Sequence, residues 1–456
     1  MGKEVEVQEN KMGVMPVGKL LLSMSIPMMI SMLVQALYNI VDSMFVAKLS
    51  ENALTAVSLA FPVQNLMIAV GTGTGVGINA LVSRSLGEKK KEYANSAANN
   101  GIYLAIFSFI GFALVCGLFA PAFFRVQTAD SQIITYGIEY VRVIGIMSFG
   151  LFIQLCAEKL LQSTGKTIYS MATQLLGAVI NIILDPIMIF GLLGFPRMEV
   201  TGAALATVTG QIIAAVAGVI MNMKLNKELH ISLVKYKLNG EVIRNIYSVG
   251  FPSIIMASVG SVMTFGMNKI LMGFTSTATA VFGVYFKLQS FIFMPVFGLN
   301  NGMVPIVAYN YGARKPKRIT KAIKLSIIYG VCIMLAGFVV FQLFPGNLLG
   351  IFSASGAMLE IGIPALRTIS LSFLIAGFSV VASSVFQALG HGFLSLAVSV
   401  LRQLFVLLPA AYILAKVGGL GACWWAFPIA EVFSGVICFI FIRYAYKKEI
   451  HPLYEK

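Results

Sequence analysis

The sequence predicts an all-α membrane protein in which twelve transmembrane helices form two parallel six-helix repeats. Composition is the first observation behind this prediction, since 58% of the 456 residues are hydrophobic, 11% are charged and the mean hydropathy is +0.87. Soluble domains carry about 25% charged residues. The second is that apolar stretches of bilayer-spanning length recur along the chain, and lipid admits only helices or closed barrels. The third is an internal repeat at an offset of 225 residues.

The apolar stretches mark the expected helices, and each exceeds the roughly 20 residues that a helix needs to cross the hydrocarbon core. Their approximate bounds are 20–47, 53–83, 94–119, 134–157, 166–191, 199–223, 245–272, 278–308, 319–344, 361–386, 392–416 and 420–446.

The two halves of the chain carry the same residue types in the same register. Examples that lie 225 positions apart are Pro27 and Pro252, Gln64 and Gln289, Gly73 and Gly298, Gly77 and Gly302, Gly87 and Gly312, and Gln162 and Gln387. Six helices return the chain to its starting side, so the repeats are parallel, as in several transporter folds. We therefore expect an N-terminal lobe over 1–223, a cytoplasmic linker over 224–244 and a C-terminal lobe over 245–456. The linker is either a solvated connection or a short interfacial amphipathic helix.

The net charge of +15 is distributed unevenly between the predicted loops. If the N-terminus is inside, most cations fall in inside segments around 3–19, 84–91, 159–166, 224–244, 314–324 and 443–456, so that Lys159 and Lys166 count as cytoplasmic loop residues. The outside segments hold only Lys48, Arg125, Arg197 and Lys416. This asymmetry follows the positive-inside rule and predicts an inner-membrane protein with both termini in the cytoplasm. The basic loops are expected to attract anionic lipid headgroups, so the charge does not indicate a nucleic-acid partner.

The sequence contains no catalytic or metal-binding constellation. The five cysteines lie in apolar segments without CxxC spacing, and the three histidines are scattered through loops and the tail. A glycine-rich run at 71–77 resembles a phosphate-binding loop, but it lies inside a predicted helix and follows no strand. The chain is therefore predicted not to be an enzyme and to need no cofactor. Transport would draw on an ion gradient or on the gradient of the substrate.

Two carboxylates are expected inside the membrane, where a charged side chain is costly and marks a functional candidate. Asp42 lies 23 residues beyond Lys19 on the first helix, and Asp185 lies 19 residues beyond Lys166 on the fifth. Because a helix rises about 1.5 Å per residue, both carboxylates reach the outer half of the bilayer.

Polar groups near these carboxylates complete a candidate ion site. Asn181 precedes Asp185 by one helical turn, and Thr207 of the descending sixth helix reaches a similar depth. Pro186 has no backbone N–H, so a carbonyl one turn earlier is left free. Carboxylates bind protons, and sodium prefers hard oxygen ligands. We therefore predict that Asp42, Asn181, Asp185 and Thr207 bind H⁺ or Na⁺, and we predict no other metal site.

The repeat retains this site in one half only. The residues 225 positions after Asp42 and Asp185 are Met267 and Ala410. A residue needed for packing would be expected in both copies, so we place ion coupling in the N-terminal half. Two structural alternatives remain open. Asp42 could be solvated at the outer end of its helix near Lys48, and the Asp185–Pro186 pair could be a helix-stop signal.

Further intramembrane residues are candidates for a substrate cavity or for helix bending. The predicted cavity residues are Gln35, Tyr38 and Asn39 on the first helix and Lys287 on the eighth. Lys287 either lines the cavity or extends its ammonium group to the membrane surface. Pro27 and Pro186 are the predicted bending positions. Glu431, on the twelfth helix, has no evident partner in the sequence.

These motifs together resemble the multidrug and toxic compound extrusion (MATE) transporters. The run Gln-Ala-Leu-Tyr-Asn-Ile-Val-Asp at 35–42 is similar to their first helix. Their repeated loop is similar to Arg-Ser-Leu-Gly-Glu-Lys-Lys at 84–90 and Tyr-Asn-Tyr-Gly-Ala-Arg-Lys at 309–315. Residues 181–186 and 202–207 resemble their helices five and six. The resemblance extends over about residues 15–445 and points to the DinF-like branch, whose ion site similarly lies in the N-terminal lobe.

The resemblance implies two lobes around a central cavity and an antiporter, coupled to protons or sodium, that exports amphipathic organic cations and drugs across the cytoplasmic membrane. The alternative is a lipid-linked saccharide flippase of a related fold, which should line its cavity with cations. Lys287, Arg142, Arg367 and Arg402 keep that alternative open. The acidic pair favours a cationic cargo.

Overall fold

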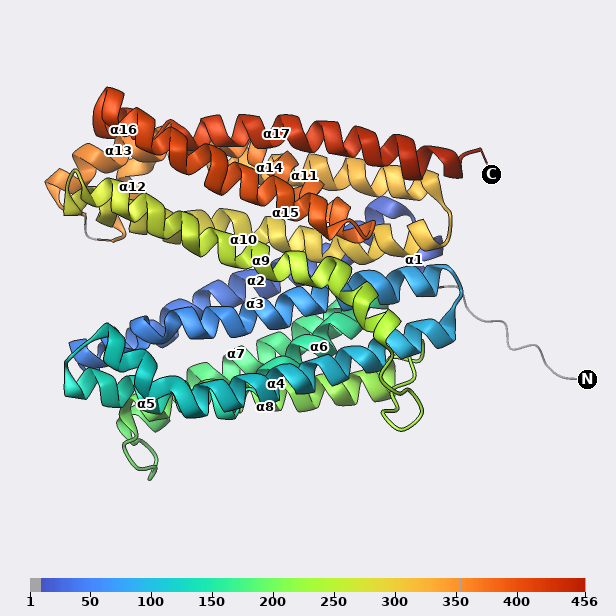
Figure 1. The fold of residues 1–456 in the computed structure, drawn as a ribbon, viewed down its shortest axis with the longest axis horizontal. Coiled ribbons are helices and arrows are strands. Elements are labelled where there is room, and N and C mark those ends of the chain that lie inside the picture. The colour runs from blue at the N-terminus through green and yellow to red at the C-terminus, as the bar shows by residue number, and fades with distance from the viewer. Residues whose placement is uncertain (1–9, 353, 456) are drawn as a thin grey trace, which may run out of the picture.

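The computed structural model describes residues 10–352 and 354–455, in which helices are joined by short loops and no β-strand occurs. This confirms the predicted all-α fold. Residues 1–9 and Lys456, which include part of the predicted cytoplasmic termini, lie outside the described residues. The helices form two bundles, and α1 lies at the same end of the molecule as the C-terminus (Figure 1).

The first bundle is the N-terminal lobe. Its helices are α1 (Lys11–Val14), α2 (Val17–Ala47), α3 (Glu51–Gly87), α4 (Lys91–Gln127), α5 (Ser131–Ile146), α6 (Phe149–Ser163), α7 (Thr167–Phe190) and α8 (Glu199–Leu225). The second bundle is the C-terminal lobe. Its helices are α9 (Gly240–Met272), α10 (Ser276–Gly312), α11 (Pro316–Leu343), α12 (Pro345–Gly350), α13 (Gly356–Ser370), α14 (Phe373–Ala388), α15 (Gly392–Val400), η1 (Leu401–Leu407), α16 (Leu408–Cys423), α17 (Ala426–Ala445), η2 (Tyr446–Ile450) and η3 (His451–Leu453).

The predicted fourth and tenth spans each consist of two helices with a bend between them. α5 meets α6 at 45°, and α13 meets α14 at 51°. Ten other helical segments of the described chain are long and apolar enough to cross a membrane alone, with α15, η1 and α16 counted as one segment and α17, η2 and η3 as another. Counting each bent pair as one span gives 12. The bends occupy the same place in both repeats, and the twelve-span prediction is confirmed.

Capping side chains explain why equivalent helices begin at equivalent positions. Ser50 accepts a hydrogen bond of 3.0 Å from the backbone N–H of Ala53 at the start of α3. Thr275, 225 residues later, accepts one of 3.0 Å from Ala278 at the start of α10. Each cap satisfies one of the backbone donors that a helix start leaves free. The repeat therefore retains the signals that start its helices as well as the apolar segments.

Glycines bring the lobes into close contact at the end of the molecule that carries α1, whereas the lobes diverge toward the opposite end (Figure 1). A Cβ on Gly77 of α3 would lie 2.1 Å from the carbonyl oxygen of Ile246 on α9. A Cβ on the equivalent Gly302 of α10 would lie 2.5 Å from Oγ of Ser25 on α2. The Ser25 hydroxyl donates to the carbonyl of Leu299 at 3.2 Å. Repeated glycines therefore permit symmetric packing of α3 on α9 and of α10 on α2.

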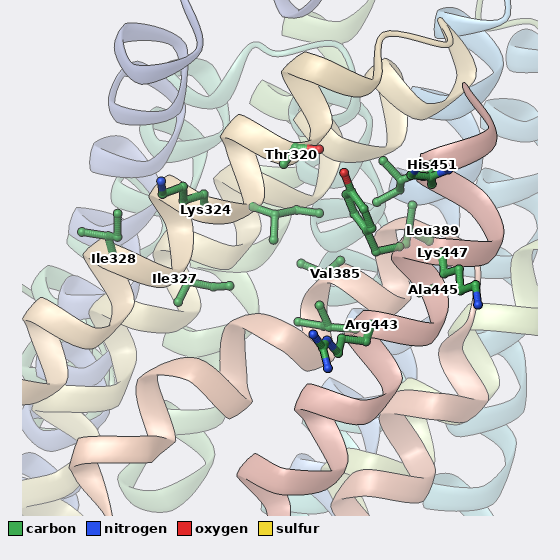
Figure 2. Close-up of a pocket in the computed structure, with 14 residues that line it drawn as sticks. Thr320, Lys324, Ile327, Ile328, Val385, Leu389, Arg443, Ala445, Lys447 and His451 are labelled. Atoms are coloured by element: carbon green, nitrogen blue, oxygen red, sulfur yellow. The ribbon is translucent and has the colours of Figure 1, made fainter. Parts of the chain in front are cut away.

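The C-terminal lobe carries a groove of about 720 Å³ between α11, α14 and the end of α17 with η2 (Figure 2). Aliphatic side chains such as Ile327, Val385 and Leu389 form much of its wall, and Lys324 and Arg443 also line it. Since the groove contains none of the predicted ion-site or cavity residues, it is separate from the candidate site described below.

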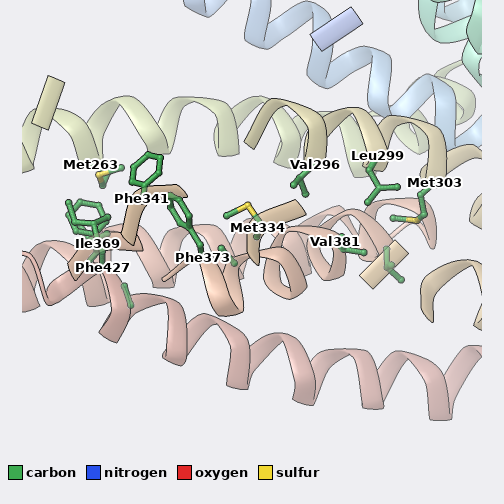
Figure 3. Close-up of a cluster of buried hydrophobic side chains, with 14 of the residues drawn as sticks. Met263, Val296, Leu299, Met303, Met334, Phe341, Ile369, Phe373, Val381 and Phe427 are labelled. Carbon is green, nitrogen blue, oxygen red and sulfur yellow. The ribbon is translucent and has the colours of Figure 1, made fainter. Parts of the chain in front are cut away.

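Aliphatic, methionine and aromatic side chains together fill the core of the C-terminal lobe (Figure 3). Phe341 of α11 and Phe373 of α14 pack edge to face with ring centroids 5.2 Å apart. Phe373 also packs against Phe293 of α10 at 5.6 Å. Edge-to-face pairs stabilise by about 0.5–1.5 kcal/mol beyond the burial of their area. Within lipid, close packing of this kind is a main source of helix association.

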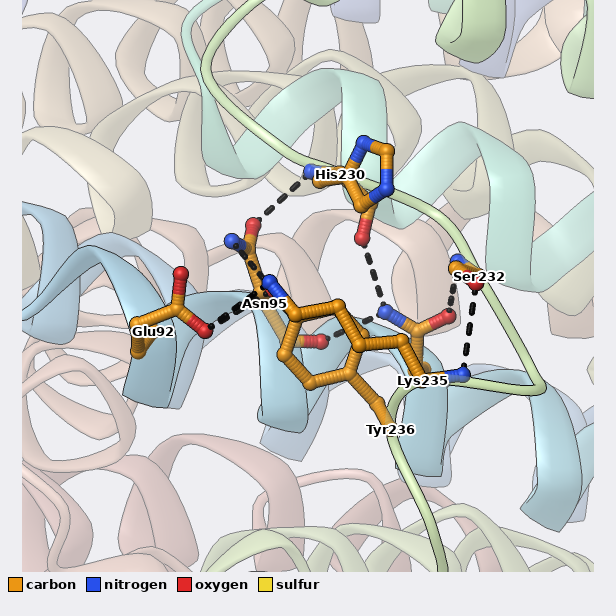
Figure 4. Close-up of polar contacts among 7 residues, drawn as sticks. Glu92, Asn95, His230, Ser232, Lys235 and Tyr236 are labelled. Atoms are coloured by element: carbon orange, nitrogen blue, oxygen red, sulfur yellow. Dashed lines mark hydrogen bonds and ion pairs between the residues drawn. The ribbon is translucent and has the colours of Figure 1, made fainter.

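The connection between the lobes is held on α4 by a row of asparagines (Figure 4). Asn95 accepts a hydrogen bond of 2.8 Å from the N–H of His230 and donates one of 3.1 Å to the Tyr236 hydroxyl. Asn99 donates to the carbonyl of His230 at 2.9 Å and accepts from the N–H of Ser232 at 2.8 Å. Residues 226–239 contain turns and no helix, so the linker is shorter than the predicted 224–244 and is not an amphipathic helix. Its backbone groups are satisfied by side chains of α4 instead.

Replacing Asn99 with Leu is expected to release the linker. The His230 carbonyl and the Ser232 N–H would lose their partners, which costs about 1–3 kcal/mol for each buried group left unsatisfied. Limited trypsin digestion should then cut faster at Lys235. Asn52→Leu, which removes an exposed side-chain bond to Gln132 of 2.7 Å, is the matched control. Equal digestion of both variants would contradict the anchoring role.

Candidate functional site

Asp185 lies at the centre of a polar cluster inside the N-terminal lobe. Its side chain on α7 is fully buried. Asn181, one turn earlier, donates from Nδ2 to Oδ1 of Asp185 at 3.4 Å and to Oγ1 of Thr207 on α8 at 3.1 Å. Small residues permit this approach of α8, since a Cβ on Gly210 would lie 2.6 Å from the carbonyl oxygen of Gly177. The structure therefore brings together three of the four predicted ion-site residues through direct hydrogen bonds.

Asp42 joins the cluster from α2. Its carboxyl group lies within hydrogen-bonding range of the carboxyl group of Asp185. Tyr38, one turn earlier on α2, lies near Thr207, Asp42 and Asp185. Tyr38 was predicted as a cavity residue, and the structure places it at the edge of the ion site. Two carboxyl groups, an amide and two hydroxyls from α2, α7 and α8 thus meet at one place.

Three oxygen atoms of this cluster have no hydrogen-bond partner among the described residues. They are Oδ1 of Asp42, Oδ2 of Asp185 and Oδ1 of Asn181, and all three are buried. Buried polar atoms are nearly always hydrogen-bonded, so such a group requires an explanation. All three are acceptors, and two carboxylates held this close repel each other when both are ionised. A proton or a small cation among them would remove both costs, and oxygen ligands suit a hard cation.

The surroundings of the two carboxylates differ from those expected if Asp42 were solvated near Lys48 or if Asp185–Pro186 ended its helix. Lys48, the proposed neighbour of a solvated Asp42, extends over the ring of Phe45 with 5.7 Å between Nζ and the ring centroid. The Asp185–Pro186 pair does not end its helix, because α7 continues to Phe190. Both carboxylates therefore belong to the interior of the lobe.

The remaining cavity candidates lie in two places. Gln35 on α2 accepts a hydrogen bond of 3.3 Å from Gln174 of α7 and donates one of 3.4 Å to Asn39, whose side chain is exposed. Lys287 lies apart from them on α10, where it is exposed and its ammonium group is 5.8 Å from the ring centroid of Phe352. Lys287 therefore lies outside the polar cluster, and its place in a substrate cavity stays a prediction.

The two predicted bending positions lie inside continuous helices. Pro27 is buried within α2, which runs unbroken from Val17 to Ala47. Pro186 lies within α7 directly after Asp185. A proline removes one helical hydrogen bond and is a common position of kinks. Bending at these positions remains a prediction.

One buried cation was assigned to the wrong place by sequence. Lys159 was counted among the cytoplasmic loop residues, but it is 7% exposed and lies on α6. Its ammonium group donates to Oε1 of Gln162 at 2.9 Å and to Oδ1 of Asn301 on α10 at 3.0 Å. Lys159 therefore connects the two lobes. The adjacent Glu158, a second charge in the same apolar segment, was the available signal.

The comparisons with known proteins agree with the fold. The sequence model of the MatE family matches residues 27–187 and again 252–413, so the family pattern occurs once in each lobe. The multidrug export protein MepA of Staphylococcus aureus (strain MRSA252) is 28% identical over 421 residues, with 91% of each chain covered. MepA of Staphylococcus haemolyticus (strain JCSC1435) is 27% identical over 441 residues, covering 95% of this chain and 94% of the relative.

Solved structures lead to the same family. A multidrug resistance MATE family transporter of the MOP superfamily in an outward-facing conformation superimposes with a TM-score of 0.92 and 26% identity, covering 98% of this chain and 99% of that chain. A MATE protein in the bent conformation superimposes with a TM-score of 0.89 and 26% identity over 96% of both chains. Because these relatives are transporters, the prediction that the chain is not an enzyme is confirmed. The chain is a multi-pass membrane protein that belongs to the MatE family of multidrug efflux transporters.

Proposed function

We propose that this transporter exports amphipathic organic cations across the cell membrane in exchange for protons or sodium ions bound at Asp42 and Asp185. The observation that carries the proposal is the facing carboxyl pair with its buried, unpartnered acceptor oxygens. Burying charge within a lipid-embedded lobe is costly, so a pair of this kind indicates a site that changes its charge during function.

Each residue of the cluster has a distinct part in the proposed exchange. Asp42 and Asp185 supply the negative charge that the ion neutralises. The acceptor oxygen of Asn181 is directed to the ion because its Nδ2 is held by Thr207 at 3.1 Å. Asp42 and Tyr38 lie on α2, the helix that carries Pro27, so a change at the carboxyl pair acts directly on this helix.

Coupling follows from competition for one acidic site. An organic cation is attracted to the lobe while Asp42 and Asp185 are ionised, and it loses that attraction when an ion neutralises them. Two ligands that exclude each other at a site lower each other's affinity by the same factor. Gln35 and the exposed Asn39 extend the polar face of α2 beside this site and are the proposed contacts of the cargo.

The orientation and the lipid contacts are also part of the proposal. The end at which the lobes meet carries the basic segments that the positive-inside rule assigns to the cytoplasm. The diverging end would then face outward. The groove lined by Lys324 and Arg443 lies near the cytoplasmic surface in this orientation, where anionic headgroups attract cations.

The flippase alternative is not favoured. The relatives whose names state a cargo class are multidrug exporters. Within the N-terminal lobe the buried charges of the candidate site are carboxylates, and an anionic lipid would require cations there. Lys287, one of the cations that kept this alternative open, is exposed on α10 and lies over Phe352.

Efflux of ethidium from proteoliposomes, with a pH gradient or a sodium gradient imposed alone, tests the proposal. Export should follow one gradient and be absent without it. If neither gradient drives export by protein shown to be folded, ion-coupled cation transport is the wrong function.

Replacing Asn181 with Ala is expected to weaken ion binding without unfolding the lobe. The loss of one ligating oxygen and of the bond that orients Thr207 should raise the ion concentration for half-maximal efflux about tenfold, since such bonds contribute about 1–3 kcal/mol. Ser43→Ala is the control, because the exposed Ser43 hydroxyl donates only to the carbonyl of Asn39, at 2.9 Å, in the described structure. An unchanged ion dependence in Asn181→Ala would remove Asn181 from the site.

A further inference from the structure

A second cavity lies on the side of the C-terminal lobe that faces the N-terminal lobe, where α9, α10, α14, η1 and α17 form most of its wall and α3 closes one side through Thr72, Gly73 and Val76. Its volume is about 570 Å³, within the roughly 300–1,000 Å³ typical of small-molecule sites. This lobe carries Met267 and Ala410 at the positions equivalent to Asp42 and Asp185. Any binding in this cavity must therefore use other polar residues.

The polar wall of the cavity contains a buried ion pair. Nη1 of Arg402 lies 3.0 Å from Oε2 of Glu431, which is 5% exposed. This contact supplies the partner of Glu431 that was not evident in the sequence. Arg402 lies in η1, a π-helical stretch, and π-helical turns within α-helices are rare and frequent at functional sites. Since the two charges neutralise each other, the cavity does not require a ligand of net charge.

Three buried atoms that line this cavity lack a hydrogen-bond partner in the described part of the chain. They are Oε1 of Glu431, Oδ1 of Asn300 and Oγ of Ser434. Asn300 and Ser434 are 5% and 1% exposed. The amide nitrogen of Asn300 already donates to the carbonyl of Val380 at 3.3 Å, so its free atom is an acceptor. The Ser434 hydroxyl can donate or accept, but the carboxylate and amide oxygens of Glu431 and Asn300 can only accept, so a ligand that satisfies them must donate hydrogen bonds.

Aromatic rings form the apolar part of the wall of the same cavity. Tyr285, Phe286 and Phe293 of α10 and Phe427 of α17 all line it. Tyr285 and Phe427 pack together with ring centroids 5.9 Å apart. Such rings stack on flat aromatic ligands and attract the positive edge of N–H groups.

We infer that this cavity is a second ligand site, which takes planar aromatic amines or amidines through their N–H donors. Glu431, Asn300 and Ser434 would accept from the ligand, and Arg402 would hold Glu431 in place. The inference rests on the proposed function for the cargo class. Recognition differs between the two sites: the N-terminal site selects positive charge, and the C-terminal site selects N–H donors. Tetraphenylphosphonium, an aromatic cation without N–H groups, therefore does not bind to the second site.

Equilibrium dialysis of ethidium against the purified full chain separates the two sites. In Asp42→Asn/Asp185→Asn protein, about one ethidium should still bind per chain and tetraphenylphosphonium should not. Adding Glu431→Gln should weaken the remaining ethidium binding at least about tenfold. Because that change leaves Arg402 unpaired, Ser434→Ala provides a milder second variant with an expected weakening of about threefold. Ser326→Ala is the matched control, since Ser326 is buried with an unpartnered hydroxyl in the described residues but does not line the cavity.

The inference is overturned if the Asp42→Asn/Asp185→Asn protein binds no ethidium. It is equally overturned if Ser434→Ala binds as tightly as Ser326→Ala. Vesicle transport separates this failure from failure of the proposed function. Wild-type protein that binds ethidium in this cavity but does not export it would overturn the proposed export and leave the second site intact.

Discussion

Asp185→Asn is expected to lower ion-driven ethidium export at least about a hundredfold, which is the equivalent of roughly 2.7 kcal/mol. Asparagine has nearly the size of aspartate but cannot be ionised. The pair with Asp42 would then carry at most one negative charge instead of two. The attraction of the site for the ion and for the organic cation would fall accordingly. Initial rates of efflux from proteoliposomes at matched protein content provide the measurement.

Stability should not account for this loss. Asp185 is fully buried, so removing its charge removes a desolvation cost and should leave thermal unfolding unchanged or shifted upward. Glu360→Gln is the matched control, because Glu360 is an exposed carboxylate on α13 of the other lobe. If Asp185→Asn exports ethidium as fast as Glu360→Gln does, the carboxyl pair is not the coupling site.

Gly77→Val is expected to prevent the lobes from closing at the end that carries α1. The added Cβ would lie 2.1 Å from the carbonyl oxygen of Ile246, a backbone atom that cannot rotate away. α3 and α9 would have to separate, which opens the proposed cytoplasmic side and interrupts the transport cycle. Spin labels at the cytoplasmic ends of the two helices should show a longer mean distance, and export should be lost.

Gly111→Val separates this effect from the cost of a branched residue in a helix. A Cβ on Gly111 of α4 would meet nothing within 4 Å, so the same change there should leave both distance and export as in the wild type. Identical spin-label distances in Gly77→Val and Gly111→Val would show that the glycine contact does not control closure.

Much of the fold could be predicted because the repeat and the apolar segments are local properties of the sequence. The register of 225 residues anticipates both the equivalent caps at Ser50 and Thr275 and the close contacts of Gly77 and Gly302. Segment length does not reveal a bend, so the breaks between α5 and α6 and between α13 and α14 were absent from the prediction. The linker was also placed too long, because its anchoring on Asn99 depends on residues more than a hundred positions away.

The candidate site was predicted in part because depth along a helix can be counted from the sequence. Counting placed Asp42, Asn181, Asp185 and Thr207 at one level, and the structure brings them together. Counting does not give the rotation of one helix against another. The position of Tyr38 beside Thr207 therefore had to come from the structure.

Residue spacing along the sequence could not predict the contacts that join distant segments. Lys159 and Asn301 lie 142 residues apart and in different lobes. Arg402 and Glu431 lie 29 residues apart on different helices, and sequence alone left Glu431 without a partner. In both cases a charge within an apolar segment indicated that a partner must exist, but only the packing of the helices identifies it.

Exchange of an ion for the cargo at Asp42 and Asp185 is tested most directly by recording ion movement that the cargo drives. Proteoliposomes would be loaded with ethidium, with pH and sodium concentration equal on both sides and valinomycin with potassium holding the membrane potential at zero. Outward flow of ethidium should then carry protons or sodium inward, and Asp42→Asn/Asp185→Asn protein should carry neither. Ethidium efflux by the wild type without movement of either ion would contradict the exchange.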